Sequence, residues 1–242
     1  MSHNIGPEEF AKFVRSRRSI RSFKSDPIPQ ELLDRVLADA KWGPSWTNTQ
    51  PYFIAIATGE KRDRISEAYL KLFDASLDAQ HGKRFAKVKM FLTGKGKPDG
   101  DYKTYLPYPD ELKPYRNKTG FELYKLLGIA REDRNARDAQ WRRNFEFFGA
   151  PTVIFVFVHD GLKQFAAQDA GIMEQTLMLS AHANGLGTCP QGAIPTWASP
   201  VRAEFEIPKH YKFITAISIG YPAEDIINTF NPGRREIDRT SN

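Results

Sequence analysis

A single cysteine, Cys189, is present in the 242 residues of the chain. One cysteine excludes an internal disulfide framework and any metal site that needs several cysteines. The five histidines show no H-x-x-x-H spacing, so the sequence does not indicate a metal centre. No base stands beside Cys189, and we interpret it as a packed residue because free cysteine is among the most buried residue types.

Motifs of several common enzyme classes are also missing. The chain has no G-x-S-x-G turn, on which many serine hydrolases place their nucleophile, and no G-x-G-x-x-G turn of a Rossmann site. The loop at residues 93–101 (T-G-K-G-K-P-D-G-D) lacks the spacing of a P-loop. No side chain is therefore marked as a nucleophile or an acid–base pair. This pattern is expected where a bound cofactor supplies the chemistry.

Long apolar runs are rare. Residues 175–201 carry no charged side chain, but glycines and prolines interrupt them, and His182, Asn184 and Gln191 are polar. A spanning helix needs about 20 continuous, predominantly apolar residues, so we expect no membrane span. The chain begins without a basic, apolar leader, and we expect a cytoplasmic protein.

Positive charge is unevenly placed along the chain. Residues 83–118 hold ten Lys or Arg against four acids, a difference that equals the net charge of +6 for the whole chain. Such a range could attract nucleic acid or a phosphorylated ligand, although most basic ranges are solvated surface. No nucleic-acid motif is present and the aromatics do not alternate with bases, so we expect no nucleic-acid partner. A basic nucleic-acid-binding module remains the alternative from a different class.

The hydrophobic pattern predicts a mixed α+β fold in one domain, residues 1–242. Compact apolar runs predict strands at 52–58, 152–158 and 213–219, and amphipathic spacing predicts helices at 29–40 and 61–79. A helix predicted at 168–183 carries only Asp169 and Glu174 as charged residues. A helix of that composition is buried, either in its own core or in a dimer interface.

The pattern changes between about residue 90 and residue 142, which we interpret as an insert. It begins with the glycine- and lysine-rich loop, continues with several tyrosines, and then predicts helical segments at about 121–127 and 132–143. An insert with tyrosines and a basic rim could form a lid over an active site. Plain surface elaboration is the alternative.

The segment Arg17-Arg18-Ser19-Ile20-Arg21 places three guanidinium groups and a hydroxyl within five residues. Arginine presents a rigid fork of donors that matches phosphate oxygens and keeps its charge. The residue types therefore indicate an anion such as phosphate. A solvated helix end is the alternative, because cations also suit a helix C-terminus.

A second landmark, the loop from Gly43 to Tyr52 (G-P-S-W-T-N-T-Q-P-Y), follows some twenty-five residues later. The pairing of R-R-S-x-R-x-F with P-S-x-x-N-x-Q-P-aromatic resembles the FMN-dependent nitroreductase family, and residues 185–192 and 220–236 extend the likeness. The resemblance implies an obligate homodimer whose mostly antiparallel sheet is flanked by helices. It also implies that each of two FMN sites lies in the dimer interface.

The resemblance assigns the flavin contacts residue by residue. Arg17 and Ser19, with Arg18 beside them, match phosphate-binding positions, and Arg21 matches a basic position near the pyrimidine end of the flavin ring. Arg235 matches a late phosphate-binding residue, although its neighbour Arg234 could take that role. The loop that packs on the flavin of the other subunit is matched by Pro44, Ser45, Trp46 and Asn48.

Further matches concern the reactive side of the flavin. The stretch Pro190-Gln191-Gly192 matches the backbone beside flavin N5, where a glycine permits close approach. Some family members carry Glu at the position of Gln191. Asn144 roughly matches another polar flavin contact, with the spacing shifted by one residue.

The activity implied by the resemblance is the reduction of flat aromatic acceptors, nitroaromatics and quinones, with NAD(P)H in a ping-pong hydride transfer through FMN. Alternatives within flavin chemistry are a flavin reductase, a dehalogenase-like enzyme, a flavin-degrading enzyme and a flavin carrier without catalysis.

Overall fold

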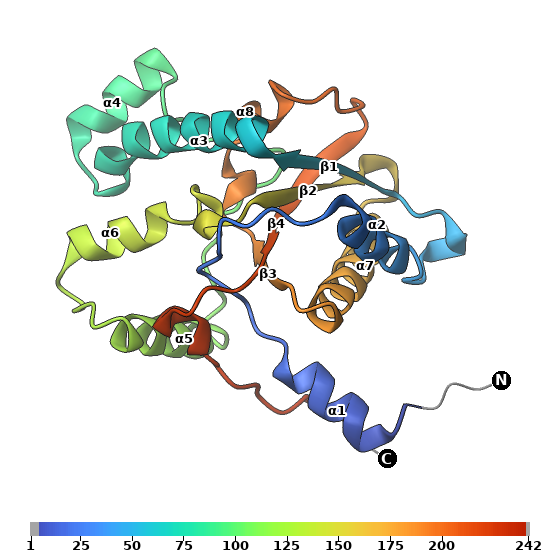
Figure 1. Cartoon of the computed structure of the whole chain (residues 1–242). Coiled ribbons are helices and arrows are strands. Elements are labelled where there is room, and N and C mark those ends of the chain that lie inside the picture. The colour runs from blue at the N-terminus through green and yellow to red at the C-terminus, as the bar shows by residue number, and fades with distance from the viewer. Residues whose placement is uncertain (1–4, 241–242) are drawn as a thin grey trace.

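The computed structural model describes residues 5–240, so the first four and last two residues of the expected domain lie outside the described part. Its centre is a four-stranded antiparallel sheet in the order β1-β2-β4-β3 (Figure 1). The strands are β1 (Tyr52–Thr58), β2 (Thr152–His159), β3 (Gly187–Gln191) and β4 (Tyr211–Gly220). The mostly antiparallel α+β fold is therefore confirmed, and three of the strands lie where the apolar runs predicted them.

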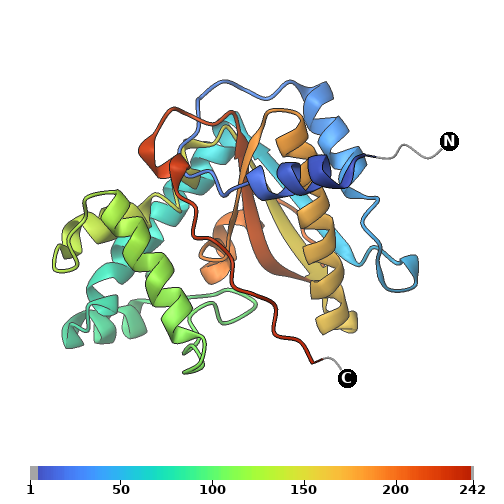
Figure 2. The same cartoon turned by 90° about the horizontal axis from the view of Figure 1, so that it is seen from below.

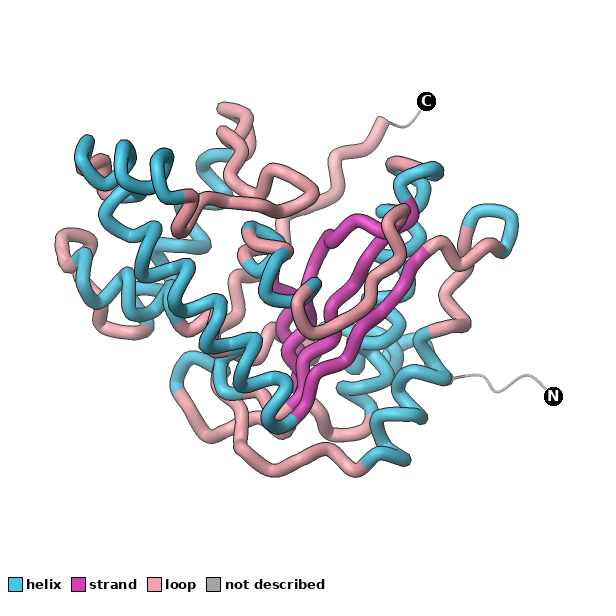
Figure 3. Tube along the Cα trace, turned by 90° about the horizontal axis from the view of Figure 1, so that it is seen from above, coloured by secondary structure: helices cyan, strands magenta, loops and turns pink. Residues whose placement is uncertain are grey.

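Helices cover both faces of the sheet (Figure 1, and Figure 3 from above). One face packs against α2 (Gln30–Ala40) and α7 (Gln164–Ala183), where Val36, Leu177 and Ile154 share a cluster. The other face packs against α3 (Gly59–Gln80) and the short α8 (Ser199–Arg202), around Phe73 and Phe155. Strand β2 is buried on both faces, which explains why its sequence is a continuous apolar run rather than an alternating one.

The insert lies to one side of the sheet (Figures 1 and 2). It contains α4 (Arg84–Thr93), α5 (Lys113–Leu126) and α6 (Arg134–Arg142). Helix α4 was not predicted; it packs against α3, whereas α5 lies beside the short helix η5 (Ile226–Thr229). The basic range 83–118 is therefore divided between separate parts of the molecule.

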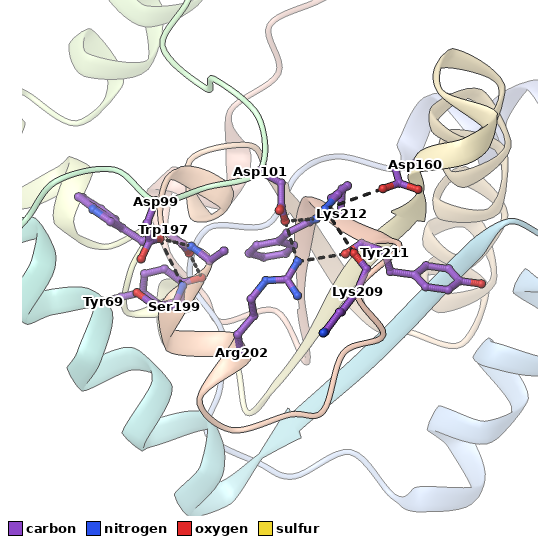
Figure 4. Close-up of polar contacts among 12 residues, drawn as sticks. Tyr69, Asp99, Asp101, Asp160, Trp197, Ser199, Arg202, Lys209, Tyr211 and Lys212 are labelled. Atoms are coloured by element: carbon purple, nitrogen blue, oxygen red, sulfur yellow. Dashed lines mark hydrogen bonds and ion pairs between the residues drawn. The ribbon is translucent and has the colours of Figure 1, made fainter.

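Residues 99–101 fasten the start of the insert to the core (Figure 4). The Asp99 carboxylate accepts hydrogen bonds from the backbone N–H groups of Ala198 (2.6 Å) and Ser199 (3.3 Å). The space between these contacts is so narrow that a Cβ on Gly100 would lie 1.9 Å from the carbonyl oxygen of Pro195. The chain that continues from this point starts from a fixed position.

Asp101 makes the second part of this anchor (Figure 4). Its Oδ2 accepts hydrogen bonds from Arg202 Nη2 and from the backbone N–H of Phe213, both at 2.8 Å. One carboxylate oxygen thus joins the insert to α8 and to β4. Charge-assisted bonds of this kind are roughly twice as strong as neutral ones.

Helix α1 (Pro7–Ser16) and the C-terminal segment 231–240 project from this body (Figures 1 and 2). No residue of α1 is buried, and Phe10 on its apolar side is 53% exposed. Every residue of 231–240 is exposed as well. Two segments at opposite ends of the chain are therefore left without a core of their own.

Within residues 5–240, no helix has the length and apolar character that crossing a membrane requires.

Candidate functional site

The segment Arg17–Arg21 runs in extended conformation along the edge of the sheet, next to β3. Ser19 forms a parallel bridge with Thr188, and the N–H of Ile20 donates to the Thr188 carbonyl at 2.9 Å. Side chains alternate across an extended chain, and Ile20 points into the core. Ser19 and Arg21, on either side of Ile20 in the sequence, therefore point away from the core.

Asn228 holds this segment in place, a role that the sequence did not reveal. Its Oδ1 accepts hydrogen bonds from the backbone N–H groups of Arg21 (2.8 Å) and Ser22 (3.2 Å). Its Nδ2 donates to the carbonyls of Ser22 (2.8 Å) and Ala223 (2.9 Å). Nearby, Arg18 Nη1 donates to the carbonyl of Thr229 at 3.4 Å. One amide side chain thus ties the two ends of the fold together beside the arginines.

Of the two late arginines, Arg234 lies near enough to Arg17 for its charge to act on that residue. Partial burial, followed by the positive charge of Arg234, lowers the pKa of Arg17. A half-buried guanidinium group with a second positive charge near it suits a bound anion. Arg235 points elsewhere: it bonds to Asp238 Oδ2 at 2.7 Å, and its guanidinium carbon lies 5.3 Å from the ring centroid of Tyr115 on α5.

The arginines face a small cavity of about 320 Å³, which Arg17 and Arg18 line together with Ser16, His182 and Thr188. His182 Nε2 and Ser16 Oγ form a hydrogen bond of 2.7 Å. Burial and the charges of Arg17 and Arg18 lower the pKa of His182. The neutral imidazole adds no further positive charge near neutral pH, so the arginines dominate this cavity electrostatically.

Gln191 is the last residue of β3, three positions after Thr188, and its side chain points inward rather than toward solvent. It is 2% exposed; Oε1 accepts from Ser218 Oγ at 2.5 Å, and Nε2 donates to the Asn144 carbonyl at 2.8 Å. Both ends of the amide are thereby used in fixing the end of β3. The part played by Ser218 was not foreseen, since nothing in its local sequence distinguishes it from other serines in strands.

Gly192 follows at the surface of a larger cavity. A Cβ at this position would meet no described atom within 4 Å, and Gly192 does not have the positive φ that favours glycine. Neither packing within the chain nor backbone strain requires a glycine here. The space that a side chain would fill is consistent with the close approach of a ligand.

The larger cavity has a volume of about 840 Å³, within the range of cofactor and ligand sites. Its inner wall is core: Arg21, Asn144, Cys189, Pro190, Gln191, Gly192 and Ala193. Its outer wall is the insert: Thr104, Tyr105, Leu106, Pro107, Tyr108, Lys113, Arg116, Asn117 and Trp141. The insert thus lies over the predicted flavin positions, and its action as a lid stays a prediction.

Cys189 also borders this cavity. The thiol is almost fully buried, and burial raises its pKa to about 11. Because the thiolate is the nucleophilic form, the neutral thiol agrees with the packed role that we inferred.

The loop that contains Pro44, Ser45, Trp46 and Asn48 has a well-defined local structure. The backbone N–H of Trp46 donates to Asp169 Oδ2 at 2.9 Å, and its ring lies 4.4 Å from that of Phe165. Thr47 and Asn48 both have positive φ, 47° and 57°. This conformation is strained for a β-branched residue such as threonine and is commonly held at functional sites. Trp46 is 53% exposed, so the fixed loop presents an aromatic surface to the outside.

This loop does not lie beside the arginines of its own chain. It precedes Tyr52 at one end of β1, whereas Ser19 pairs with Thr188, which aligns through β4 and β2 with Thr58 at the other end of β1. From the Ser19 segment to the start of β1, the separation is four strand spacings across the sheet and six residues along a strand, which is roughly 28 Å. The structure thus brings Arg21 and residues 190–192 to one cavity and Arg17 to another beside Thr188, and it leaves residues 44–48 at the opposite corner.

Comparison with known proteins finds similarity over most of the chain. The model of the nitroreductase family matches residues 14–221. The nitroreductase NfnB of Mycolicibacterium smegmatis is 32% identical over 87% of this chain and 81% of its own length. A 4-nitrobenzoate reductase of Nocardioides sp. is 32% identical over 96% of this chain and 88% of its own.

A solved structure supports the fold over almost the whole chain. The crystal structure of the FMN-dependent nitroreductase NfnB from Mycobacterium smegmatis in complex with NADPH superposes with a TM-score of 0.79 and 29% identity. It covers 96% of this chain and 98% of that one.

Proposed function

Because this chain belongs to the nitroreductase family, we propose that it is an FMN-dependent oxidoreductase that uses NAD(P)H to reduce flat aromatic acceptors. Bound FMN would supply the hydride-transfer chemistry that links NAD(P)H oxidation to reduction of the acceptor in two half-reactions. The observation that carries the proposal is that the arginine segment 17–21 and the stretch 187–192, far apart in the sequence, together line two cavities at the β3 edge.

We assign the phosphate of FMN to Arg17, Ser19 and Arg234. Two guanidinium groups and a hydroxyl suit a phosphate dianion, and such a ligand would offset the burial and the repulsion from Arg234 that lower the pKa of Arg17. Arg18 and Arg235 stay candidates for the outer part of the same site.

Around the ring, Arg21 would stabilise the negative charge that develops at the pyrimidine end on reduction. Asn144 and residues 190–192 would form the floor of the slot, with Gly192 leaving room for close approach. The two hydrogen bonds of the Gln191 side chain keep this floor in position.

We further propose that two copies of the chain form the complete site. Pro44, Ser45, Trp46 and Asn48 lie too far from the arginines of their own chain to contact the same flavin. A second copy would bring its own loop to each arginine cluster. The projecting helix α1 and the exposed segment 231–240 supply surfaces for such an arrangement. The outer side of α7 is also free of charge at its exposed residues, Gln164, Gln168, Gly171, Gln175 and Ala183.

The acceptors that we propose are nitroaromatics and quinones. Several relatives are nitroaromatic reductases by name, and Tyr105 and Tyr108 offer aromatic surfaces in the cavity on which flat rings can stack. Flavin reduction, dehalogenation or flavin degradation would use the same cavity with other products, so product analysis separates them.

The experiment is to purify the protein, record its visible absorbance for bound flavin, and follow NAD(P)H oxidation with nitrobenzene. We expect a yellow protein that oxidises NAD(P)H only when an acceptor is present. A colourless protein that FMN cannot reconstitute would contradict the proposal, and bound FMN without turnover would indicate a carrier. Binding of nucleic acid is disfavoured because the basic range is divided between α4 and α5.

A further inference from the structure

The larger cavity carries a one-sided charge. Its lining includes three cations, Arg21, Lys113 and Arg116, and no aspartate or glutamate. A cavity with one sign of charge favours ligands of the opposite sign. What the three cations contact decides which of them is free to meet such a ligand.

Two of the three cations are already engaged. Arg21 lies on the inner wall, where its Nη1 donates to the carbonyl of Ser19 at 3.3 Å, and we assign its charge to the flavin. Lys113 Nζ forms an ion pair with Asp110 at the rim. Like Arg21, Arg116 forms no ion pair with any carboxylate among the described residues, but it lies on the outer wall, where we assign it no contact with the flavin.

Arg116 is nevertheless held in a defined place. Its guanidinium carbon lies 5.2 Å from the ring centroid of Tyr108, and its Nη1 lies 3.4 Å from Asn117 Oδ1. A guanidinium group that lies over an aromatic face keeps donors at its edge, and these match the two oxygens of a carboxylate. Tyr108 is 49% exposed and lines the same cavity, so the Arg116–Tyr108 pair presents a ring face and a positive charge together.

The position of the pair follows from the anchor of the insert. A hydrogen bond of 2.7 Å joins Thr104 Oγ1 and Thr196 Oγ1. Thr104 follows Asp99 and Asp101, the two residues that anchor the insert, closely in the sequence. The outer wall therefore begins at a fixed point beside the inner wall.

We propose that Arg116 binds the carboxylate of aromatic acid acceptors, with Tyr108 beneath it, and so determines which nitroaromatics the enzyme prefers. This inference rests on the proposed flavin-dependent function. A phosphate group offers the same oxygens, so the 2′-phosphate of NADPH is the competing source of the anion. We favour the carboxylate because Arg116 lies against a ring that can stack on a small aromatic acid.

The test compares two acceptors on the holoenzyme, 4-nitrobenzoate and the neutral 4-nitrobenzamide. Wild type should prefer the acid, and R116Q should lower the ratio of the two kcat/KM values by about 10-fold to 100-fold, as expected for lost hydrogen bonds to a charged group. R137Q is the matched control: Arg137 lies 5.5 Å from the ring centroid of Tyr124, in the insert but outside the cavity lining. R137Q should leave the ratio at the wild-type value.

Calorimetric titration with benzoate and benzamide gives a readout without turnover. Benzoate should bind more tightly to the wild-type holoenzyme, and R116Q should remove most of that difference. An unchanged ratio and unchanged benzoate affinity in R116Q would overturn the assignment. The assignment would also be overturned if R116Q lost a preference for NADPH over NADH while keeping the preference for the acid. That result would show that Arg116 binds the nucleotide phosphate.

Failure of the proposed function looks different. In that case the wild-type protein would lack flavin, or would fail to oxidise NAD(P)H with either acceptor. A flavin-bound wild type that reduces both acceptors equally well would overturn only the role of Arg116.

Discussion

The two walls of the larger cavity are built differently. On the inner wall, Gln191 is buried and both ends of its amide are hydrogen-bonded. On the outer wall, Tyr105, Tyr108 and Arg116 are exposed side chains of an insert that is fastened to the core at residues 99–101. A fixed inner wall suits a cofactor that must keep its geometry, whereas exposed aromatic and cationic side chains suit the selection of changing substrates.

The largest expected effect comes from the phosphate side of the inner wall. R17A should weaken FMN binding about 100-fold, because a guanidinium makes two charge-assisted hydrogen bonds to a phosphate. Fluorescence titration of the apoprotein with FMN measures this change. R15A is the control, since Arg15 is an exposed residue of α1 only two positions away. Equal FMN affinity of R17A and wild type would place the phosphate elsewhere.

A smaller effect is expected from the support beneath the inner wall. S218A leaves Gln191 Oε1 buried without its donor and should lower the free energy of unfolding by about 1–3 kcal/mol, measured by urea denaturation. It should also change the visible spectrum of the bound flavin. S66A is the comparison, because Ser66 is a buried serine that donates to the Phe145 carbonyl. If both variants lose stability but neither changes the spectrum, Gln191 does not position the cofactor.

The smallest effect is expected at the outer wall. D101N should lower the free energy of unfolding by about 1–2 kcal/mol, since the bond to Arg202 loses its charge. The KM for the acceptor should rise a few-fold, while FMN affinity stays near the wild-type value. The control is E204Q, which removes the charge of another ion pair, the one with Arg64. A change in FMN affinity as large as that in KM would show that the two walls are not separable.

The sequence was informative where burial dictates residue type. The strands β1, β2 and β4 are apolar runs because they lie between helices, and their bounds were predicted closely. Strand β3 was not recognised, because G-T-C-P-Q has little strand propensity. It tolerates Pro190 since it is an edge strand, where a missing N–H breaks no ladder between neighbours.

Site residues were predictable only where chemistry marked them. Three arginines in five residues indicate an anion without any structure. Asn228 and Ser218 carry no such mark, since their roles depend on contacts between residues more than 20 positions apart. Sequence also could not choose between Arg234 and Arg235. In the structure the charge of Arg234 acts on Arg17, whereas the Arg235 guanidinium lies over the ring of Tyr115.

Mixing two variants, each altered in one half of the proposed shared site, tests most directly the claim that the arginine cluster of one chain works with the 44–48 loop of another. R17A and W46A are unfolded together, refolded as a mixture with FMN, and assayed for NAD(P)H oxidation with a nitroaromatic acceptor. In a two-fold symmetric dimer, each mixed pair contains one intact site, so roughly a quarter of wild-type activity should return. A mixture no more active than its separate components would contradict a site shared between two chains.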